Sequence, residues 1–410
     1  MRRARPAASC AATAAILMAA MPSALGAPAD FALQPYQMVR SLQLIQDRIA
    51  NGDSAAMPMQ RKLLEMIDER LRKTGIDVFK NERNFRALLM YAMSGGNPRT
   101  VTELLAKAQI SPADKALARG VMGYINGRPA DATEALRSVD PLAEEPELGA
   151  FLALVKGSVL TSENPARALS SFDQARLLAP GTLIEEGALR RSLALAAQME
   201  DTARFLRDSD QYIRRFLHSP YAGQFADSFV AGIVKLRPAV KLDAIAAVVS
   251  DMDAEHGRFI YLRLARAATL AGQTTLAVFA SKRAEPPAGV MPSDPRAGLY
   301  ASIASITSGN VGEIIGKLQA IDPQRLSESD QQLRDAALRI AREVTARPPA
   351  PKGTMVHAPE IAVDERAALP ASGNLDPKPD MAAAKATETL VSQTQQQLQS
   401  IDKLLQETSE

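Results

Sequence analysis

The fold of this 410-residue chain is decided by a stretch at residues 149–180, which reads GAFLALVKGSVLTSENPARALSSFDQARLLAP. Apolar residues recur in it with the 3.6-residue period of an α-helix, and Asn164-Pro165 interrupts the run. An asparagine side chain can accept a hydrogen bond from the first turn of a helix, and a proline at the first helical position gives up a donor that has no partner there. The stretch therefore predicts two short helices joined by a tight turn.

The second of these helices has the residue spacing of a known repeat. Small, aromatic, small and terminating residues follow one another in the order found in the second helix of a tetratricopeptide repeat, which this unit resembles: Ala168, Phe172, Ala175 and Pro180. One unit earlier the match is partial, at Gly120, Gly127 and Ala132. The other units share only the period.

Turns in the middle of such hairpins recur along the chain. Measured at Pro98, Pro129, Pro165, Glu200, Arg237, Gly272 and Gly309, they lie 31 to 37 residues apart. A single hairpin of this length cannot bury enough apolar surface, so hairpins of this period stack into a solenoid. We expect residues 27–346 to form an all-α, tetratricopeptide-like solenoid.

Helix starts are marked by a capping residue followed by proline. Seven such pairs occur: Asn97-Pro98, Ser111-Pro112, Asp140-Pro141, Asn164-Pro165, Ser219-Pro220, Asp294-Pro295 and Asp322-Pro323. Before the first of them, Asn51-Gly52 and Gly75 are expected to end two amphipathic helices. The pairs predict many short helices with tight connections.

The N-terminus has the pattern of a secretory signal peptide. Three arginines within the first five residues precede an apolar run at residues 11–21, and Ala24 and Gly26 place small side chains before a cleavage site. This apolar run is too short to span a bilayer, which needs about 20 residues. We expect cleavage after Gly26. The net charge would then change from +2 to −1, and Cys10, the one cysteine, would be lost.

The other end of the chain is expected to be a linker and a helix. Residues 347–381 are rich in proline and poor in large apolar side chains, which predicts a disordered segment. Residues 382–410 regain a helical pattern, with apolar positions spaced for about two heptads at Val391, Leu398, Ile401 and Leu405. This helix is either a partner-docking element on a tether or a marginal helix with no role.

The amino-acid composition argues against most kinds of catalytic and ligand-binding site. The chain has no Trp, three His and nearly balanced charge, with 48 Lys plus Arg against 46 Asp plus Glu, so it lacks the basic excess of nucleic-acid-binding proteins. It has no phosphate-binding loop, dinucleotide fingerprint or nucleophile elbow. His218, His256 and His357 are expected at the surface or in caps, not as metal ligands. We predict no catalytic, cofactor-binding or metal-binding residues.

Several side-chain clusters have simple structural interpretations. Glu328-Ser329 lies within Ser327-x-x-Asp330, a pattern that caps a helix. The charge pairs are expected on solvated faces, where the arginine pairs could also meet an acidic partner: Glu144-Glu145, Glu185-Glu186, Arg190-Arg191 and Arg214-Arg215. The aromatic residues at helical spacing between Phe205 and Phe229 are favoured as a core stripe over a peptide-binding groove.

Two stretches near the start of the expected mature chain carry a family resemblance. Residues 35–43 read PYQMVRSLQ and residues 59–65 read MQRKLLE, and both resemble the MotC family of flagellar motility proteins. The resemblance extends over residues 31–347. It implies a periplasmic, non-enzymatic protein required for flagellar rotation, which binds the periplasmic part of the stator protein MotB and has a dedicated chaperone.

A second class of function stays open from the residues alone. Export and repeated helices are also compatible with a helical cell-wall protein, either a peptidoglycan-processing enzyme or its adaptor. A general assembly factor with many clients is a third possibility. Binding to the stator protein, turnover of peptidoglycan, or binding to many secreted proteins would separate the three.

Overall fold

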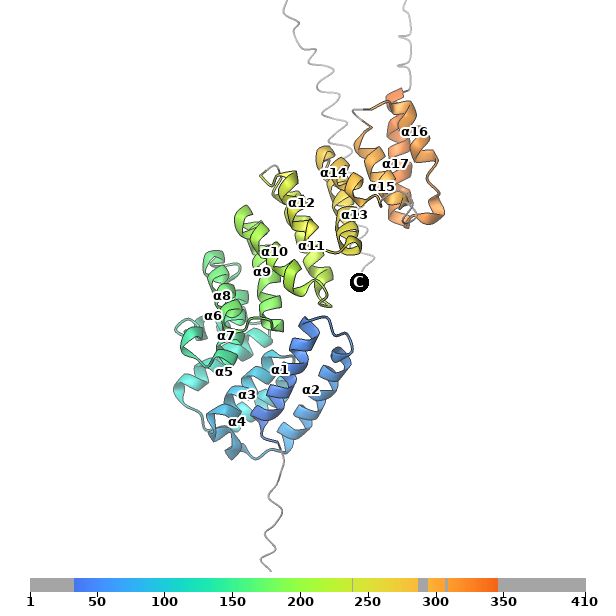
Figure 1. Ribbon diagram of the computed structural model, residues 1–410. Helices are drawn as coiled ribbons and strands as arrows, with labels where there is room; N and C mark the ends of the chain where they lie inside the picture. The colour runs from blue at the N-terminus through green and yellow to red at the C-terminus, as the bar shows by residue number, and fades with distance from the viewer. Residues whose placement is uncertain (1–32, 238, 287–293, 307–308, 346–410) are drawn as a thin grey trace, which may run out of the picture. The chain divides into compact units, whose positions relative to one another are not determined.

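The computed structural model describes residues 33–237, 239–286, 294–306 and 309–345 (Figure 1). These residues contain 17 α-helices and three short 3-10 helices, and no strand occurs among them. The predicted all-α class is confirmed, whereas the assignment to a tetratricopeptide-like solenoid stays a prediction. The expected signal peptide (1–26), linker (347–381) and terminal helix (382–410) lie outside the described residues, as do Cys10 and His357. No helix in these ranges combines the length and apolar character needed to cross a membrane.

The helices follow one another along the chain as short elements. In order they are α1 (Pro35–Ala50), α2 (Ala56–Lys73), η1 (Ile76–Lys80), α3 (Glu82–Met93), α4 (Pro98–Lys107), α5 (Pro112–Ile125), α6 (Pro129–Ala135), η2 (Pro141–Ala143), α7 (Pro146–Leu160), α8 (Pro165–Leu178), α9 (Leu183–Gln198), α10 (Thr202–Phe216), α11 (Ala222–Lys235), α12 (Leu242–Ser250), α13 (Ala254–Leu270), α14 (Thr274–Ala284), α15 (Pro295–Ala304), α16 (Val311–Gln319), η3 (Pro323–Arg325) and α17 (Glu328–Thr345).

The predicted turns coincide with junctions between helices. All seven mid-hairpin positions fall at the boundaries of the pairs α3/α4, α5/α6, α7/α8, α9/α10, α11/α12, α13/α14 and α15/α16. Asn51-Gly52 and Gly75 also follow the ends of α1 and α2 as expected. The 31- to 37-residue period in the sequence is therefore the period of consecutive helix pairs.

The cap-and-proline pairs are confirmed with one exception. Four start α-helices with the capping side chain bonded to the first turn, and two start the 3-10 helices η2 and η3. The prediction for Ser219-Pro220 is wrong, because α11 begins only at Ala222 and has no side-chain cap. The Ser219 hydroxyl instead accepts a hydrogen bond from the Tyr221 amide at 3.2 Å, which closes a turn before the helix.

Small residues on one helix make room for aromatic rings on a neighbouring helix. A β-carbon on Gly157 of α7 would lie 2.5 Å from the ring of Phe172 on α8. Phe172 is completely buried, and so are Ala168 and Ala175 on either side of it. Gly232 of α11 makes the same close approach to the ring of Phe205. The small-aromatic-small spacing in the sequence thus marks the contact between paired helices.

The prediction of an aromatic core stripe between α10 and α11 is confirmed except at Tyr221, which is only half-buried. Phe205, Tyr212, Phe216, Phe225 and Phe229 are each at most 1% exposed. The rings of Tyr212 and Phe225 stack at 4.2 Å between centroids, and those of Phe205 and Phe229 stack at 5.8 Å. These rings join the two helices to each other and are not free to bind a peptide.

Helix α1 departs from pairing between neighbours. It packs on α2 and α3, and also on α9, which follows more than 130 residues later (Figure 1). Met38 and Leu42 belong to the core around α3, whereas Ala50 belongs to the core around α9 to α13. The loop after α1 approaches His218 so closely that a β-carbon on Gly52 would lie 2.8 Å from the histidine β-carbon. Helix α1 therefore bridges two parts of the core.

Candidate functional site

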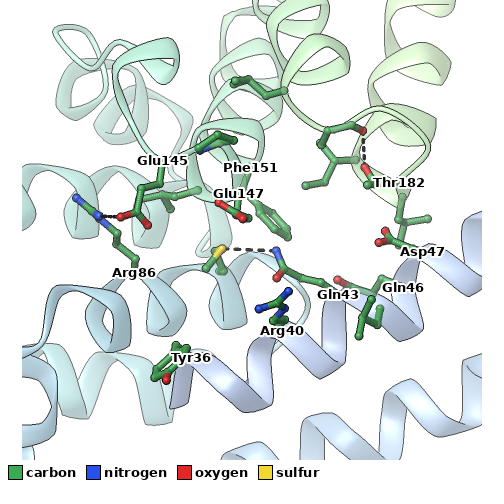
Figure 2. A pocket seen from close by; sticks show the side chains of 18 of the residues that line it. Tyr36, Arg40, Gln43, Gln46, Asp47, Arg86, Glu145, Glu147, Phe151 and Thr182 are labelled. Carbon is green, nitrogen blue, oxygen red and sulfur yellow. Dashed lines mark hydrogen bonds and ion pairs between the residues drawn. The ribbon is translucent and has the colours of Figure 1, made fainter. Parts of the chain in front are cut away.

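A cleft of about 700 Å³ opens where α1 lies beside α3, α7 and the start of α9 (Figure 2). Helix α1 contributes six lining residues, from Tyr36 to Asp47, and α3 contributes Arg83, Arg86 and Met90. The other lining residues come from the start of α7, the end of α8 and the connection that leads into α9. We call it the α1 cleft. Because its walls come from helices far apart in the sequence, it exists only in the folded chain.

Helix α1 is held in place by hydrogen bonds to α3 at its N-terminal end. The Tyr36 amide donates to the Asn84 side-chain oxygen at 3.2 Å, and the Asn84 side-chain amide donates to the oxygen of Gln34 at 3.1 Å. Asn84 is only 1% exposed, so these bonds lie in a buried setting where an unpaired amide is costly. About two turns further along α1, the Gln43 amide donates to the Met90 sulfur at 3.7 Å (Figure 2).

The cleft has an apolar floor and one exposed apolar side chain. Phe151 of α7 is 6% exposed, and the side chains of Met90 and Leu183 lie partly buried around it. Leu44 on α1 lines the same cleft but is 62% exposed. Burying a leucine side chain is favourable by about 1.5–3 kcal/mol, so Leu44 is a position where a ligand would gain binding energy.

Charged side chains of both signs line the rim. On α3, Arg86 forms an ion pair with Glu145 at 2.5 Å (Figure 2). Within the described part of the chain, no carboxylate lies within 4 Å of Arg40 or Arg83, and Glu147 has no cation at that distance. These three exposed side chains are the charges available to a ligand.

Asp47 stands at the other end of the cleft from Arg40, two helical turns along α1. Burial raises the pKa of its carboxyl above the usual value, and a hydrogen bond from the Leu183 backbone opposes this shift. The ionised carboxylate is therefore held in a partly desolvated place. It would be stabilised by a basic group or a hydrogen-bond donor from a ligand.

A network of buried carboxylates fixes the start of α9, which forms one wall of the cleft. Glu185 is 1% exposed and accepts hydrogen bonds from the Gly181 amide at 2.5 Å and from Arg215 at 2.5 Å. Glu186 is fully buried and accepts hydrogen bonds from the Tyr212 hydroxyl at 2.7 Å and from Arg190 at 3.0 Å. The donors reach it from α9 itself and from α10.

This network corrects two sequence-based expectations. Glu185-Glu186 was expected on a solvated face and is instead in the interior, because α10 brings matching donors to both carboxylates. Arg190 is likewise not a solvent-facing charge, since its side chain is 17% exposed and pairs with Glu186. Arg214 does face solvent, at 63% exposure, although it pairs with Asp210 and Asp251.

Comparison with known proteins identifies the family that this chain matches. The family model for the chemotaxis protein MotC matches residues 1–410. This chain belongs to the MotC family. It is 40% identical over 320 residues to chemotaxis protein MotC of Rhizobium meliloti (strain 1021), which covers 77% of this chain and 73% of the relative. No solved structure matches the chain. Membership of this family assigns a role in chemotaxis and motility and confirms the resemblance carried by residues 35–43 and 59–65.

Other side chains of this MotC-family protein were candidates for chemistry. His218 and His256 are brought together, with ring centroids 5.6 Å apart. His256 Nδ1 lies 2.6 Å from the carboxylate of Asp253, the residue that caps the start of α13. In the ranges that the structure covers, no group of three or more His, Cys, Asp or Glu is arranged to hold a metal ion. That the histidines bind no metal stays a prediction.

The capping interpretation of Glu328-Ser329 is confirmed. The Ser327 hydroxyl accepts a hydrogen bond from the Asp330 amide at 3.2 Å and donates to the Asp330 carboxylate at 2.9 Å, which is the start of α17. Glu328 is exposed. Glu145, by contrast with the buried pair at 185–186, is half exposed, as expected for a solvated charge.

Sequence reasoning did not identify the residues of the α1 cleft. Leu44 is the one signal that was available, because it lies off the apolar face of α1 that Met38, Leu42 and Ile49 define. An apolar residue on the polar face of an amphipathic helix indicates a contact beyond the helix itself. Arg40 and Glu147 carry no such mark, since exposed charges occur throughout the sequence.

Proposed function

We propose that this MotC-family protein is a periplasmic, non-enzymatic scaffold for flagellar rotation, which binds the periplasmic part of the stator protein MotB. Family membership over residues 1–410 is the observation that carries the proposal. The signal-peptide pattern at residues 1–26 supports export, and the succession of helix pairs supports a role in protein binding, because such arrays present broad surfaces. A dedicated periplasmic chaperone is part of the same proposal.

The buried carboxylates already accept hydrogen bonds from other side chains of the protein, and this supports a non-enzymatic role. A catalytic acid or base must have a free position from which it reaches its substrate. Asp208 is fully buried and accepts hydrogen bonds from Ser192 at 2.6 Å and Arg176 at 3.1 Å. Glu186 is engaged in the same way by Tyr212 and Arg190. These carboxylates hold helices together and leave no such position for a substrate.

Co-purification of the tagged protein with the periplasmic part of MotB tests the proposal. We expect the two to elute as one complex, and a deletion strain to assemble flagella that do not turn. Folded protein that fails to bind the stator fragment would count against the scaffold function.

Incubation with purified peptidoglycan provides the second arm of this test. The proposal predicts no turnover of the glycan. Release of soluble fragments would favour the alternative of a wall-processing enzyme. Capture of many unrelated secreted proteins would favour a general assembly factor.

A further inference from the structure

We propose that the α1 cleft is where the protein partner docks, and that the docking segment is amphipathic. Its apolar side chain enters between Leu44 and Phe151, its carboxylate faces Arg40 and Arg83, and its basic group faces Glu147. The inference rests on the proposed function, because it assumes that the chain binds a protein partner.

The apolar side chains of the cleft differ in how far they are exposed. Phe151 is 6% exposed at the floor, whereas Leu44 on the α1 wall is 62% exposed. A partner side chain placed between them would cover Leu44 and contact Phe151 and Leu183 at once. Anchors that fill an apolar pocket carry most of the energy of protein interfaces.

The charged residues of the cleft determine which charges the docking segment carries and in which direction it lies. Arg86 is neutralised by Glu145, which directly precedes α7, so it is not available. Among the described residues Arg40 and Arg83 have no carboxylate partner, and a guanidinium at the edge of an apolar cleft favours a carboxylate that it can bind with two hydrogen bonds. Glu147 stands unpaired on the opposite wall, at the start of α7.

The length of the segment follows from the positions of the charges. Arg40 and Asp47 are seven residues apart on α1, which corresponds to about 10 Å along a helix. A docking segment that places its carboxylate at Arg40 and a hydrogen-bond donor at Asp47 therefore needs about two helical turns, or about three extended residues. This span and the alternation of charged and apolar groups fit a protein segment.

The cleft is preformed, which lowers the entropic cost of docking. The connection that leads into α9 is held by the Gly181–Glu185 bond and by the Thr182 hydroxyl, which donates to the Ala179 carbonyl at 2.7 Å. On the opposite side, Gln46 lies within 3.4 Å of the Ser94 hydroxyl in a buried contact. A partner would meet walls that do not have to be ordered on binding.

Binding of the full-length protein to the periplasmic part of MotB, measured by calorimetry, tests the cleft. Leu44→Ser should weaken binding by about 10- to 100-fold, because it removes one buried leucine. The double variant Arg40→Glu/Arg83→Glu should weaken it by about tenfold or more, and the loss should shrink at high salt. Circular dichroism checks that each variant is folded.

Matched controls separate the cleft from general surface effects. Leu177→Ser changes a leucine that is 73% exposed on α8 and does not line the cleft. Arg61→Glu/Arg119→Glu reverses two exposed arginines that also lie outside it. We expect both controls to bind within about twofold of the wild type, because isolated surface changes alter little.

The outcomes distinguish the two proposals. If the wild type does not bind the stator fragment, the proposed function fails and the inference fails with it. If the wild type binds and the cleft variants bind equally well, only the inference is overturned. Wild-type dimers in sedimentation that Leu44→Ser converts to monomers would assign the cleft to a second copy. Tighter stator binding after deletion of residues 347–410 would assign it to the chain's own tail, and either result overturns the partner assignment.

Discussion

Removing one buried hydroxyl with Tyr212→Phe tests whether the carboxylate network stabilises the fold. The Tyr212 hydroxyl donates to Glu186 at 2.7 Å, and its ring stacks on Phe225 at 4.2 Å between centroids. Phenylalanine keeps the stacked ring, so the substitution removes the hydrogen bonds of the hydroxyl, to Glu186 and to the Ser219 side chain, and little else. Burial and the negative charge of Glu186 raise the pKa of Tyr212, so its hydroxyl is protonated at every pH at which the protein would be assayed.

The size of the expected loss in stability follows from the burial of Glu186, the hydrogen-bond acceptor. Glu186 is fully buried and would keep only Arg190 as a partner. A hydrogen bond to a charged group contributes about 1.5–3 kcal/mol, and a buried acceptor left unpaired belongs at the upper end of that range. We therefore expect Tyr212→Phe to lower the free energy of unfolding by about 2 kcal/mol, which shifts the melting temperature by several degrees.

Urea unfolding followed by circular dichroism at 222 nm measures the effect. Tyr221→Phe is the matched control, because Tyr221 is half-buried in the same region, with its ring 5.2 Å from the Arg190 guanidinium. It should change the free energy of unfolding by at most about 0.5 kcal/mol. A double-mutant cycle with Glu186→Gln isolates the pairwise energy. Equal stability of Tyr212→Phe and wild type, or no coupling in the cycle, would refute the assigned role of the network.

Three further predictions concern packing and ionisation. Gly157→Ala should destabilise the protein by about 1–3 kcal/mol in urea unfolding, because the new β-carbon meets the Phe172 ring, whereas Gly316→Ala, with no atom within 4 Å, should be neutral or stabilising. Asp47→Asn should raise stability at pH 7. Because the pKa of Asp47 is raised in the folded state, the wild type loses stability as pH rises through that folded pKa. The stability gained by Asp47→Asn should therefore vanish below pH about 3, where the carboxyl is protonated in the unfolded state as well. A stability gain that persists at low pH contradicts this prediction. Burial raises the pKa of Tyr91 to about 12, so its contribution is complete below pH about 10 and is lost as pH rises toward 12. Tyr91→Phe should flatten the stability profile in that window, and an unchanged slope would contradict the assignment.

The local features of this protein were predictable from the sequence. Hairpin turns, six of the seven cap-and-proline starts, the Ser327 cap and the buried stripe from Phe205 to Phe229 all appear where the sequence places them. Each depends on residues within about one or two helical turns, where the helical period and capping chemistry act directly. The exception at Ser219 arose because its hydroxyl closes a turn with the Tyr221 amide, just before α11 begins at Ala222.

The α1 cleft and the buried acids were decided by the tertiary structure. Periodicity shows which face of a helix is apolar, but it does not show which distant helix covers that face. Helix α1 meets α9 across more than 130 residues, and the donors to Glu185 and Glu186 come from up to 30 residues away. The sequence does not distinguish a helical glutamate that faces water from one that is buried and paired with an arginine. Only packing determines which of the two applies, because desolvation must be offset by donors from another element.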